Sequence, residues 1–273
     1  SAVEGVVDGI WLNQGEVCCA GSRLLIQESI ADRMITKLKA RMNTLRIGNP
    51  LDKTIDIGAV VDASQMKRIS ALVQQGVSEG AELVQPDFVK NMPSGNGCFY
   101  PPTMLLNVQP ASTVAEQEIF GPVLSVMTFR IQDEAVEIAN NTRYGLAASI
   151  WSDNINMALD MAPRIKSGIV WINGTNMMDA AVGFGGYRES GFGREGGREG
   201  MYAYLKPKYL KSLKAYSNKK EKSFAKITGD AVQSIDRTAK LYIGGKQARP
   251  DGNYSIDIVG ADGRFAGQVG EGN

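Results

Sequence analysis

The chain has 273 residues, a formal net charge of +1, and 43% hydrophobic against 22% charged residues, which is the composition of an ordinary globular protein. No apolar run approaches the length of a membrane span and no basic field favours nucleic acid, so we expect neither a membrane span nor nucleic-acid binding. The absence of histidine excludes Cys–His and Ser–His catalytic pairs, and zinc sites with imidazole ligands.

The three cysteines, Cys18, Cys19 and Cys98, are odd in number and lack the spacing of a disulfide framework or a metal cage. We therefore expect no metal site, and a reducing intracellular compartment, the cytoplasm. Any acid–base chemistry must use carboxylate, lysine, tyrosine or water, because histidine is missing.

Taken in chain order, the first 173 residues alternate between helical and strand patterns. Apolar spacing predicts helices at 1–11, 29–45, 64–80, 132–141 and 153–165. Ser29 is the expected N-cap of the second helix. Apolar runs predict strands at 23–27, 81–85, 123–129, 146–152 and 167–173. Strands that are apolar throughout and alternate with helices predict an α/β fold, in which helices flank both faces of a mainly parallel sheet.

The sequence changes character after Met201. Residues 202–216 are typical of an edge strand, and seven lysines against one acid lie between residues 206 and 222. A solvated face or a lysine-guarded edge explains these lysines, and a phosphate or polyanion patch is the alternative. Residues 217–239 are typical of a linker, and residues 240–273 predict a short β tail whose strands are separated by glycine turns.

The stretch "NQGEVCCAGSR" at 13–23 places two cysteines in a glycine-rich turn. A thiol with the ordinary pKa of about 8.5 is mostly protonated at neutral pH. Backbone N–H groups in such a turn stabilise a thiolate, and also the oxyanion that forms when the thiolate attacks a carbonyl. From these residues alone, a small buried cysteine remains the alternative to a nucleophile.

The stretch "GFGREG" at 191–196 fits the dinucleotide pattern G-x-G-x-x-G. No apolar strand precedes it, and no acid ends a strand about twenty residues further on, as the motif requires. We therefore do not interpret it as a phosphate-binding loop.

Five motifs occur in one order along the chain: "NQGEVCCAGSR", "EQEIFGPVLSV" at 116–126, "NNTRYGLAASIW" at 140–151, "SGIVWIN" at 167–173 and "GFGGYRESGFGRE" at 183–195. Together, residues 1–216 resemble the second, catalytic half of an NAD(P)-dependent aldehyde dehydrogenase. The resemblance implies a catalytic domain at 1–201 and an oligomerisation-type strand at 202–216. Past the linker, residues 240–273 resemble the first strands of a second, truncated unit, as in the tandem family-16 aldehyde dehydrogenases.

The resemblance places the nucleophile at Cys18. It implies oxidation of a small-molecule aldehyde to a carboxylic acid with NAD or NADP, through a cysteine thiohemiacetal and a thioester. Glu118 matches the carboxylate that holds the nicotinamide ribose hydroxyls, Phe120 the ring beside the nicotinamide, and Gln65 is expected near the cofactor. Without the family, a turn carboxylate and a core aromatic are the simpler readings of Glu118 and Phe120.

The resemblance also outlines a substrate pocket. Phe184 matches an aromatic residue near the aldehyde, Met178 occupies a position that is aromatic in several members, and Cys19 packs beside the nucleophile. Gly183 stands where the family usually has proline. These departures leave the identity of the aldehyde open.

The general base, the oxyanion asparagine and the pyrophosphate-binding fold of the family lie upstream of the region that matches Ser1. We therefore expect the chain to belong to a longer homo-oligomeric enzyme, and to be inactive and weak in cofactor binding by itself. Glu16 is the local alternative as a base. A noncatalytic scaffold of the same fold, acting through protein assembly, and acyl transfer to coenzyme A are the alternative functions.

Overall fold

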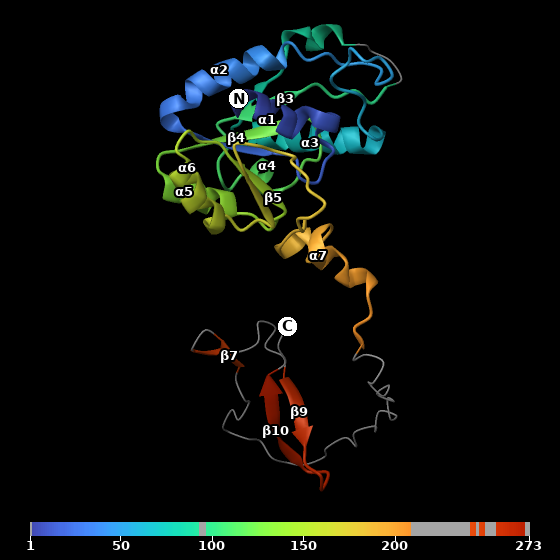
Figure 1. The fold of residues 1–273 in the computed structure, drawn as a ribbon, viewed down its shortest axis with the longest axis vertical. Helices are drawn as coiled ribbons and strands as arrows, with labels where there is room; N and C mark the ends of the chain where they lie inside the picture. The colour runs from blue at the N-terminus through green and yellow to red at the C-terminus, as the bar shows by residue number, and fades with distance from the viewer. Residues whose placement is uncertain (1, 93–96, 209–240, 244–245, 249–254, 271–273) are drawn as a thin grey trace. The chain divides into compact units, whose positions relative to one another are not determined.

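The computed structural model describes residues 2–92, 97–208, 241–243, 246–248 and 255–270 (Figure 1). The chain divides into two compact units, Ser1–Pro207 and Lys208–Asn273. No helix in the described ranges is both long enough and apolar enough to cross a membrane.

The first unit is built on a four-stranded sheet with the strand order β1-β4-β3-β2. The central strand β4 (Val123–Phe129) pairs in parallel with β1 (Arg23–Gln27) and with β3 (Thr103–Leu106). The short edge strand β2 (Glu82–Val84) joins β3 in antiparallel orientation. The predicted mainly parallel sheet is therefore confirmed.

One face of this sheet packs against α1 (Ala2–Trp11) and α2 (Ala31–Met42). Leu124 and Val126 of β4 point to this side, as the two-residue repeat of a strand requires. Leu38 of α2 lies among them and is fully buried. In Figure 1 both helices lie beside the sheet formed by the central strands.

The opposite face packs against α3 (Ala63–Ser78) and α4 (Thr113–Glu116). Val123 and Met127 of β4 point to this side, one position out of step with the first set. Helices therefore cover both faces, as the apolar strands predicted.

A second, two-stranded parallel sheet follows along the chain, formed by β5 (Ala147–Ile150) and β6 (Ile169–Ile172). Helices α5 (Gln132–Asn140) and α6 (Ile155–Met161) pack together beside it, around a small cluster that includes Phe129 of β4 and Ile150 of β5. The remaining short helices are η1 (Leu12–Gly15), η2 (Glu28–Ile30), η3 (Asp87–Asn91), η4 (Ala162–Arg164), η5 (Arg188–Ser190), α7 (Gly197–Gly200) and η6 (Tyr202–Tyr204).

Three sequence predictions need correction in the first unit. Ser29 is not the N-cap of α2, because it lies in the preceding turn of 3-10 helix and Ile30 occupies the cap position without a side-chain bond. Strand β3 was not predicted, since only three apolar residues in a row occur there, one residue after two prolines. Residues 202–204, placed in an edge strand, form a 3-10 helix instead, and the rest of that segment from residue 209 lies outside the described residues.

In the part of the second unit that the structure describes, the strands form two antiparallel pairs. Strands β7 (Leu241–Ile243) and β8 (Lys246–Ala248) form one, and β9 (Ser255–Val259) and β10 (Phe265–Gly270) form the other. Gly263, at a φ of 79°, makes the turn between β9 and β10. The predicted short strands of the tail are therefore present, whereas the predicted linker at 217–239 lies outside the described residues.

Candidate active site

The cysteine loop (residues 12–22) leaves α1 through three successive residues with left-handed backbone. Asn13, Gln14 and Gly15 have φ values of 49°, 57° and 73°. Asparagine and glycine tolerate this conformation, whereas glutamine adopts it only under constraint from its surroundings. Trp11, the last residue of α1, donates its indole N–H to the carbonyl of Pro122 at 3.2 Å and so ties the helix end to the next part of the site.

Gly15 packs directly against the turn at residues 118–121. A Cβ at Gly15 would overlap the carbonyl oxygen of Gly121 and lie 2.9 Å from that of Ile10. Only glycine allows the two backbones to approach this closely. The cysteine loop and the "EIFG" turn are therefore neighbours, although about a hundred residues separate them in the chain.

The segment that leads into α3 is bound to the cysteine loop by two side chains. The amide oxygen of Gln14 accepts a hydrogen bond from the N–H of Gly58 at 3.0 Å. Both carboxylate oxygens of Glu16 accept from the N–H of Val61 at 3.1 Å. This bond holds the Glu16 side chain against the segment before α3, and each of its carboxylate oxygens keeps a further lone pair.

The two adjacent cysteines differ in environment. Cys18 is exposed, whereas Cys19 is buried and donates its thiol hydrogen to the side-chain oxygen of Asn176 at 3.4 Å. Burial raises the pKa of the Cys19 thiol, and the neighbouring Cys18 adds to the increase. Of the pair, Cys18 is therefore the thiol that a solute can reach.

Four hydrogen bonds from α3 fix the turn that carries Glu118. The Gln65 amide donates to the carbonyls of Ile119 and Phe120 at 3.2 and 2.7 Å. The Arg68 guanidinium donates to the carbonyls of Ile119 and Glu118 at 2.8 and 2.7 Å. Phe120 has a φ of 56°, which a bulky residue adopts only when neighbours hold it there.

The carboxylate of Glu118 is half-buried. Desolvation raises its pKa, and the nearby Arg68 charge opposes that increase. Within the described part of the chain no hydrogen bond reaches its carboxylate oxygens, because the four bonds from α3 go to backbone carbonyls. The oxygens are thus available to hydroxyl donors of a ligand, such as the ribose of a nicotinamide cofactor.

Phe184 lies in a different local unit. Its N–H and carbonyl exchange hydrogen bonds of 2.7 Å with Glu195, in an isolated antiparallel bridge. The following Gly185 lies so close to Gly168 that a Cβ at Gly168 would overlap its carbonyl oxygen. Phe184 is thereby fixed to the start of β6, and its hydrogen bonds lead to Glu195 rather than to the cysteine loop.

The structure thus brings some predicted site residues together and leaves others apart. Cys18, Glu118, Phe120 and Gln65 lie on directly contacting segments. Met178 is 58% exposed in the loop after β6, two residues beyond Asn176, whose side chain binds Cys19. Within the described residues, no group of three or more His, Cys, Asp or Glu side chains could hold a metal ion.

Two residues of the site were missed by sequence reasoning. Arg68 lies three positions after Gln65 on α3, so the helical repeat alone puts both on one face. Asn176 had no such signal, because its contact with Cys19 depends on the path of the loop after β6. Gln65, expected near the cofactor, donates its side-chain amide to the backbone of the turn that carries Glu118.

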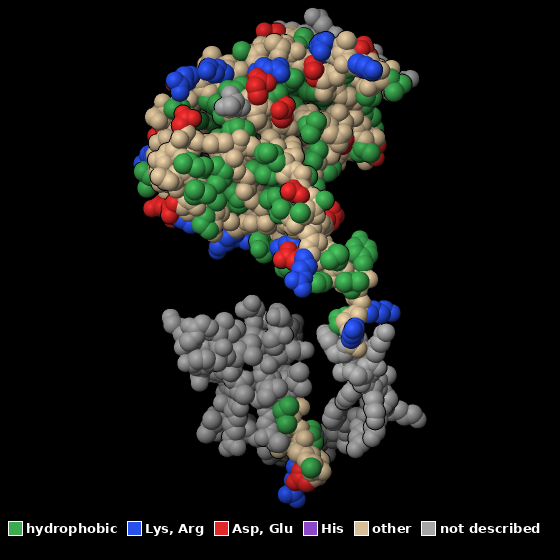
Figure 2. All heavy atoms as spheres, in the orientation of Figure 1, with side chains coloured by type: hydrophobic (Ala, Val, Ile, Leu, Met, Phe, Trp, Pro, Cys, Tyr) green, Lys and Arg blue, Asp and Glu red, His purple; other side chains and the backbone are tan. Residues whose placement is uncertain are grey.

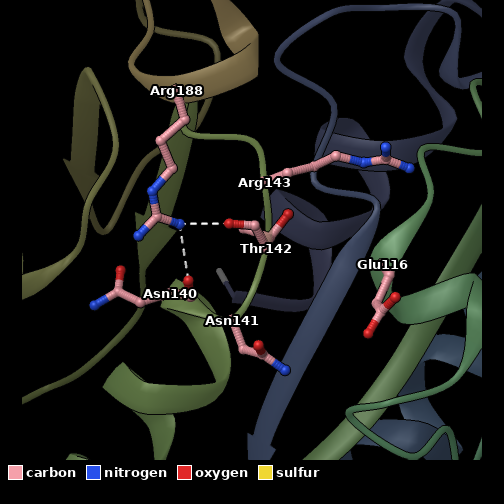
Figure 3. Close-up of a pocket in the computed structure, with 6 residues that line it drawn as sticks. All are labelled: Glu116, Asn140, Asn141, Thr142, Arg143 and Arg188. Carbon is pink, nitrogen blue, oxygen red and sulfur yellow. Dashed lines mark hydrogen bonds between the residues drawn. The ribbon is translucent and has the colours of Figure 1, made fainter. Parts of the chain in front are cut away.

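A pocket of about 520 Å³ opens at another place in the first unit (Figure 3). It is lined by Glu116, Asn140, Asn141, Thr142, Arg143 and Arg188. None of these is among the predicted site residues, so the pocket and the cysteine loop are separate features.

The first unit is similar to known proteins along its whole length. Residues 1–210 match the family model described as "Aldehyde dehydrogenase family". Among curated proteins, the chain is 40% identical over 207 residues to the putative aldehyde dehydrogenase DhaS of Bacillus subtilis, covering 76% of this chain and 41% of that protein. It is 38% identical over 207 residues to the human mitochondrial aldehyde dehydrogenase, covering 76% and 40% of the two chains.

A solved structure agrees with these relatives. The crystal structure of Staphylococcus aureus betaine aldehyde dehydrogenase in complex with NAD+ matches with a TM-score of 0.70 and 34% identity, over 75% of this chain and 41% of that one. The chain therefore spans about two fifths of the length of the proteins it matches.

Proposed function

Because the chain belongs to the aldehyde dehydrogenase family, we propose that it supplies the catalytic cysteine of an enzyme that oxidises an aldehyde to a carboxylic acid with NAD or NADP. One observation carries the proposal. The exposed thiol of Cys18 lies on a loop whose Gly15 packs against the turn that presents the open carboxylate of Glu118.

The chemistry starts at the Cys18 sulfur. Its thiolate attacks the aldehyde carbon, forming a C–S bond and a thiohemiacetal oxyanion. The N–H of Cys18 donates no hydrogen bond within the described residues, so it is available to stabilise that oxyanion. NAD or NADP bound beside it supplies the hydride acceptor that turns the thiohemiacetal into a thioester. Water then cleaves the thioester, which releases the acid and returns the thiol.

The cofactor end of the site rests on the "EIFG" turn. We propose that Glu118 accepts hydrogen bonds from the ribose hydroxyls and that the Phe120 ring packs beside the nicotinamide. Gln65 and Arg68 contribute indirectly, because they donate hydrogen bonds to the backbone carbonyls of residues 118–120 and so position the turn. Betaine aldehyde dehydrogenase, which this chain resembles, binds NAD+.

The substrate end is formed by loops from the second sheet. Met178, the Phe184 segment and Cys19 are the proposed lining, with Asn176 connecting the Met178 loop to Cys19. A flexible thioether adapts to different apolar groups, so Met178 favours a broad range of aldehydes over strict selection.

The remaining parts of the proposal concern the longer protein. We propose that the base for the Cys18 proton and the pyrophosphate-binding fold lie outside these 273 residues, so that the isolated chain does not turn over. We also propose a cytoplasmic homo-oligomer of the tandem family-16 type, in which residues 240–273 begin a second unit. The three free cysteines and the short strands of the tail support these assignments.

The test uses a protein that contains this chain within a complete aldehyde dehydrogenase. Cys18→Ser is expected to abolish NAD(P)H formation from aldehydes, whereas Cys98→Ser leaves it within about twofold because Cys98 is only partly buried, at the edge of the core cluster beneath α3, and is not among the proposed site residues. Full activity of Cys18→Ser would overturn the proposal. Inactivity of the parent with every aldehyde would favour the scaffold, and acyl-coenzyme A as the product would identify acyl transfer.

A further inference from the structure

Five consecutive backbone carbonyls at the end of α5 all accept hydrogen bonds from two arginines. Arg23 donates to the carbonyls of Ile138, Ala139 and Asn141, at 3.3, 2.8 and 3.3 Å. Arg188 donates to the two carbonyls between and beyond them, those of Asn140 and Thr142. The two arginines thus share one short stretch of backbone, residues 138–142. We call this stretch, together with Arg23 and Arg188, the arginine junction.

Arg23 reaches the junction from the cysteine side. It is the first residue of β1, directly after the cysteine loop, and its guanidinium also donates to Ala115 at 3.3 Å. Burial lowers the pKa of Arg23, and no carboxylate pairs with it in the described part of the chain. The negative end of the α5 dipole and four carbonyls take the place of a counter-ion.

Arg188 reaches the junction from the side of the predicted substrate pocket. It follows Phe184 by four residues, in a segment that also binds the start of β5. In that segment the N–H of Tyr187 donates to Gly145 at 3.0 Å, and the N–H of Glu189 donates to Arg143 at 3.1 Å. Figure 3 shows the Arg188 guanidinium directed at Asn140 and Thr142.

The junction forms one wall of the 520 Å³ pocket, yet its polar groups are already occupied. The carbonyls of Asn140 and Thr142 accept hydrogen bonds from Arg188. The side chain of Asn140 donates to the carbonyl of Arg164 and accepts from the backbone N–H of Lys166. The junction's own carbonyls are thus engaged with the two arginines, whereas the Glu116 carboxylate and the Arg143 side chain make up another part of the lining. The arrangement therefore fits a connection between two parts of the protein better than a binding site.

We propose that Arg23 and Arg188 are positioning residues that set the Phe184 segment and the β5–β6 sheet against the cysteine loop. The inference rests on the proposed function, since it gives both arginines a role in the geometry of the aldehyde pocket. Each guanidinium is planar and donates to two or more carbonyls at once. The cysteine loop and the Phe184 segment are therefore both bound to the same five residues, 138–142. Loss of either arginine is therefore expected to loosen both contacts with residues 138–142, the one made from the cysteine loop and the one made from the Phe184 segment.

The thiol of Cys19 reports on how the β5–β6 sheet is set against the cysteine loop. It is buried where Asn176, in the loop after β6, meets the cysteine loop. The test labels Cys19 with iodoacetamide in the full 273-residue chain carrying Cys18→Ser, and follows each site by mass spectrometry. Cys98 provides an internal reference, because it is partly buried against the core cluster beneath α3 and lies far along the chain from both arginines. Since this background lacks the proposed nucleophile, the result does not depend on any dehydrogenase activity.

Arg23→Met and Arg188→Met are each expected to accelerate Cys19 labelling by about tenfold or more, the effect of losing a hydrogen bond from a charged group. Cys98 keeps its rate. Arg188→Lys keeps the charge but not the planar guanidinium, and is expected to fall between the parent and the methionine variant. Arg194→Met is the matched control, because Arg194 lies in the same segment but donates to the carbonyls of Gly186, Phe192 and Gly193 and lies over the ring of Tyr187, and none of these belongs to residues 138–142.

Three results would overturn the proposal. An unchanged Cys19 rate in Arg188→Met would show that the contact at Cys19 does not depend on this arginine. Equal acceleration of Cys19 and Cys98, in Arg188→Lys as well as in Arg188→Met, would show general destabilisation. Acceleration by Arg194→Met to the same extent would assign the effect to the segment and not to the junction.

Discussion

At the scale of single residues, the site separates groups that look alike in the sequence. Cys18 and Cys19 are neighbours in the chain, yet one is exposed and the other is buried against Asn176. Glu16 and Glu118 differ in the same way, since Glu16 is bonded through both oxygens and Glu118 is not. These differences in burial and hydrogen bonding come from the folded contacts of each side chain, and a sequence does not state them.

Glu118 gives a prediction about pH. Desolvation raises its folded-state pKa, so the folded protein binds the proton more tightly than the unfolded chain. The stability from this group is therefore full below the ordinary glutamate pKa of about 4.3, and is lost as pH rises through the raised value. Glu118→Gln removes the buried charge and should stabilise the chain at pH 7, by less than about 1 kcal/mol because the carboxylate is half-exposed.

The measurement is the free energy of unfolding in urea, at about pH 7 and at about pH 4. The gain from Glu118→Gln should shrink at the lower pH, where the glutamate is mostly protonated in both states. Glu116→Gln, an exposed neighbour, serves as the control and should change little at either pH. A gain of equal size at both pH values would contradict the electrostatic origin.

Some site residues could be singled out from the sequence and some could not. The order of five motifs predicts cofactor-binding roles for Glu118 and Phe120, although neither has a local pattern that distinguishes it from a structural residue, and these roles stay predictions. The role of Gln65 depends on the carbonyls that lie opposite it, which belong to a turn more than fifty residues away. Ser29 failed as a cap because an extra 3-10 turn shifts the start of α2, and composition does not encode that shift.

At the scale of elements, the site depends on close approach between the cysteine loop and the "EIFG" turn. Gly15→Ala tests this, because the new Cβ would overlap the Gly121 carbonyl while the backbone is also left-handed, at a φ of 73°. Gly80→Ala is the matched control, since Gly80 has a φ of 104° and no atom within 4 Å of an added Cβ. Gly80→Ala therefore measures only the cost of placing alanine at a positive φ, about 1–2 kcal/mol.

Gly15→Ala should destabilise the chain by about 1–3 kcal/mol more than Gly80→Ala does, because the two segments must move apart. The difference in unfolding free energy between the two variants measures the packing term. Equal losses would mean that the loop and the turn are not in the contact described here.

Elements were predictable where the sequence carried a long enough pattern. Strand β4 was placed at its observed limits, because seven apolar or small residues run between two turns. Strand β3 is only four residues long and follows two prolines, so its pattern is too short to distinguish from a loop. The pairing of β4 between β1 and β3 is not a local property, and only the general rule for parallel sheets anticipated it.

At the scale of the whole molecule, the described surface carries charges of both signs, interspersed without a large single-sign patch on the face in view (Figure 2). Hydrophobic side chains gather over the segment that follows α7 in the same view. Several large apolar side chains between residues 177 and 205 are mostly exposed, including Met177 at 66%, Phe192 at 82% and Tyr204 at 90%. Exposed apolar groups concentrated in this way are typical of association surfaces.

Self-association of the chain is therefore expected through the segment 177–205, in agreement with the proposed homo-oligomer. Sedimentation velocity over a range of protein concentrations should show larger species that decline in the double variant Phe192→Ser, Tyr204→Ser. Both side chains already face solvent, so the substitutions should leave the unfolding free energy within about 0.5 kcal/mol of the parent. Leu51→Ser is the control, because Leu51 is 89% exposed but lies before α3, outside the segment. If the double variant and Leu51→Ser sediment like the parent at every concentration, the association surface lies elsewhere.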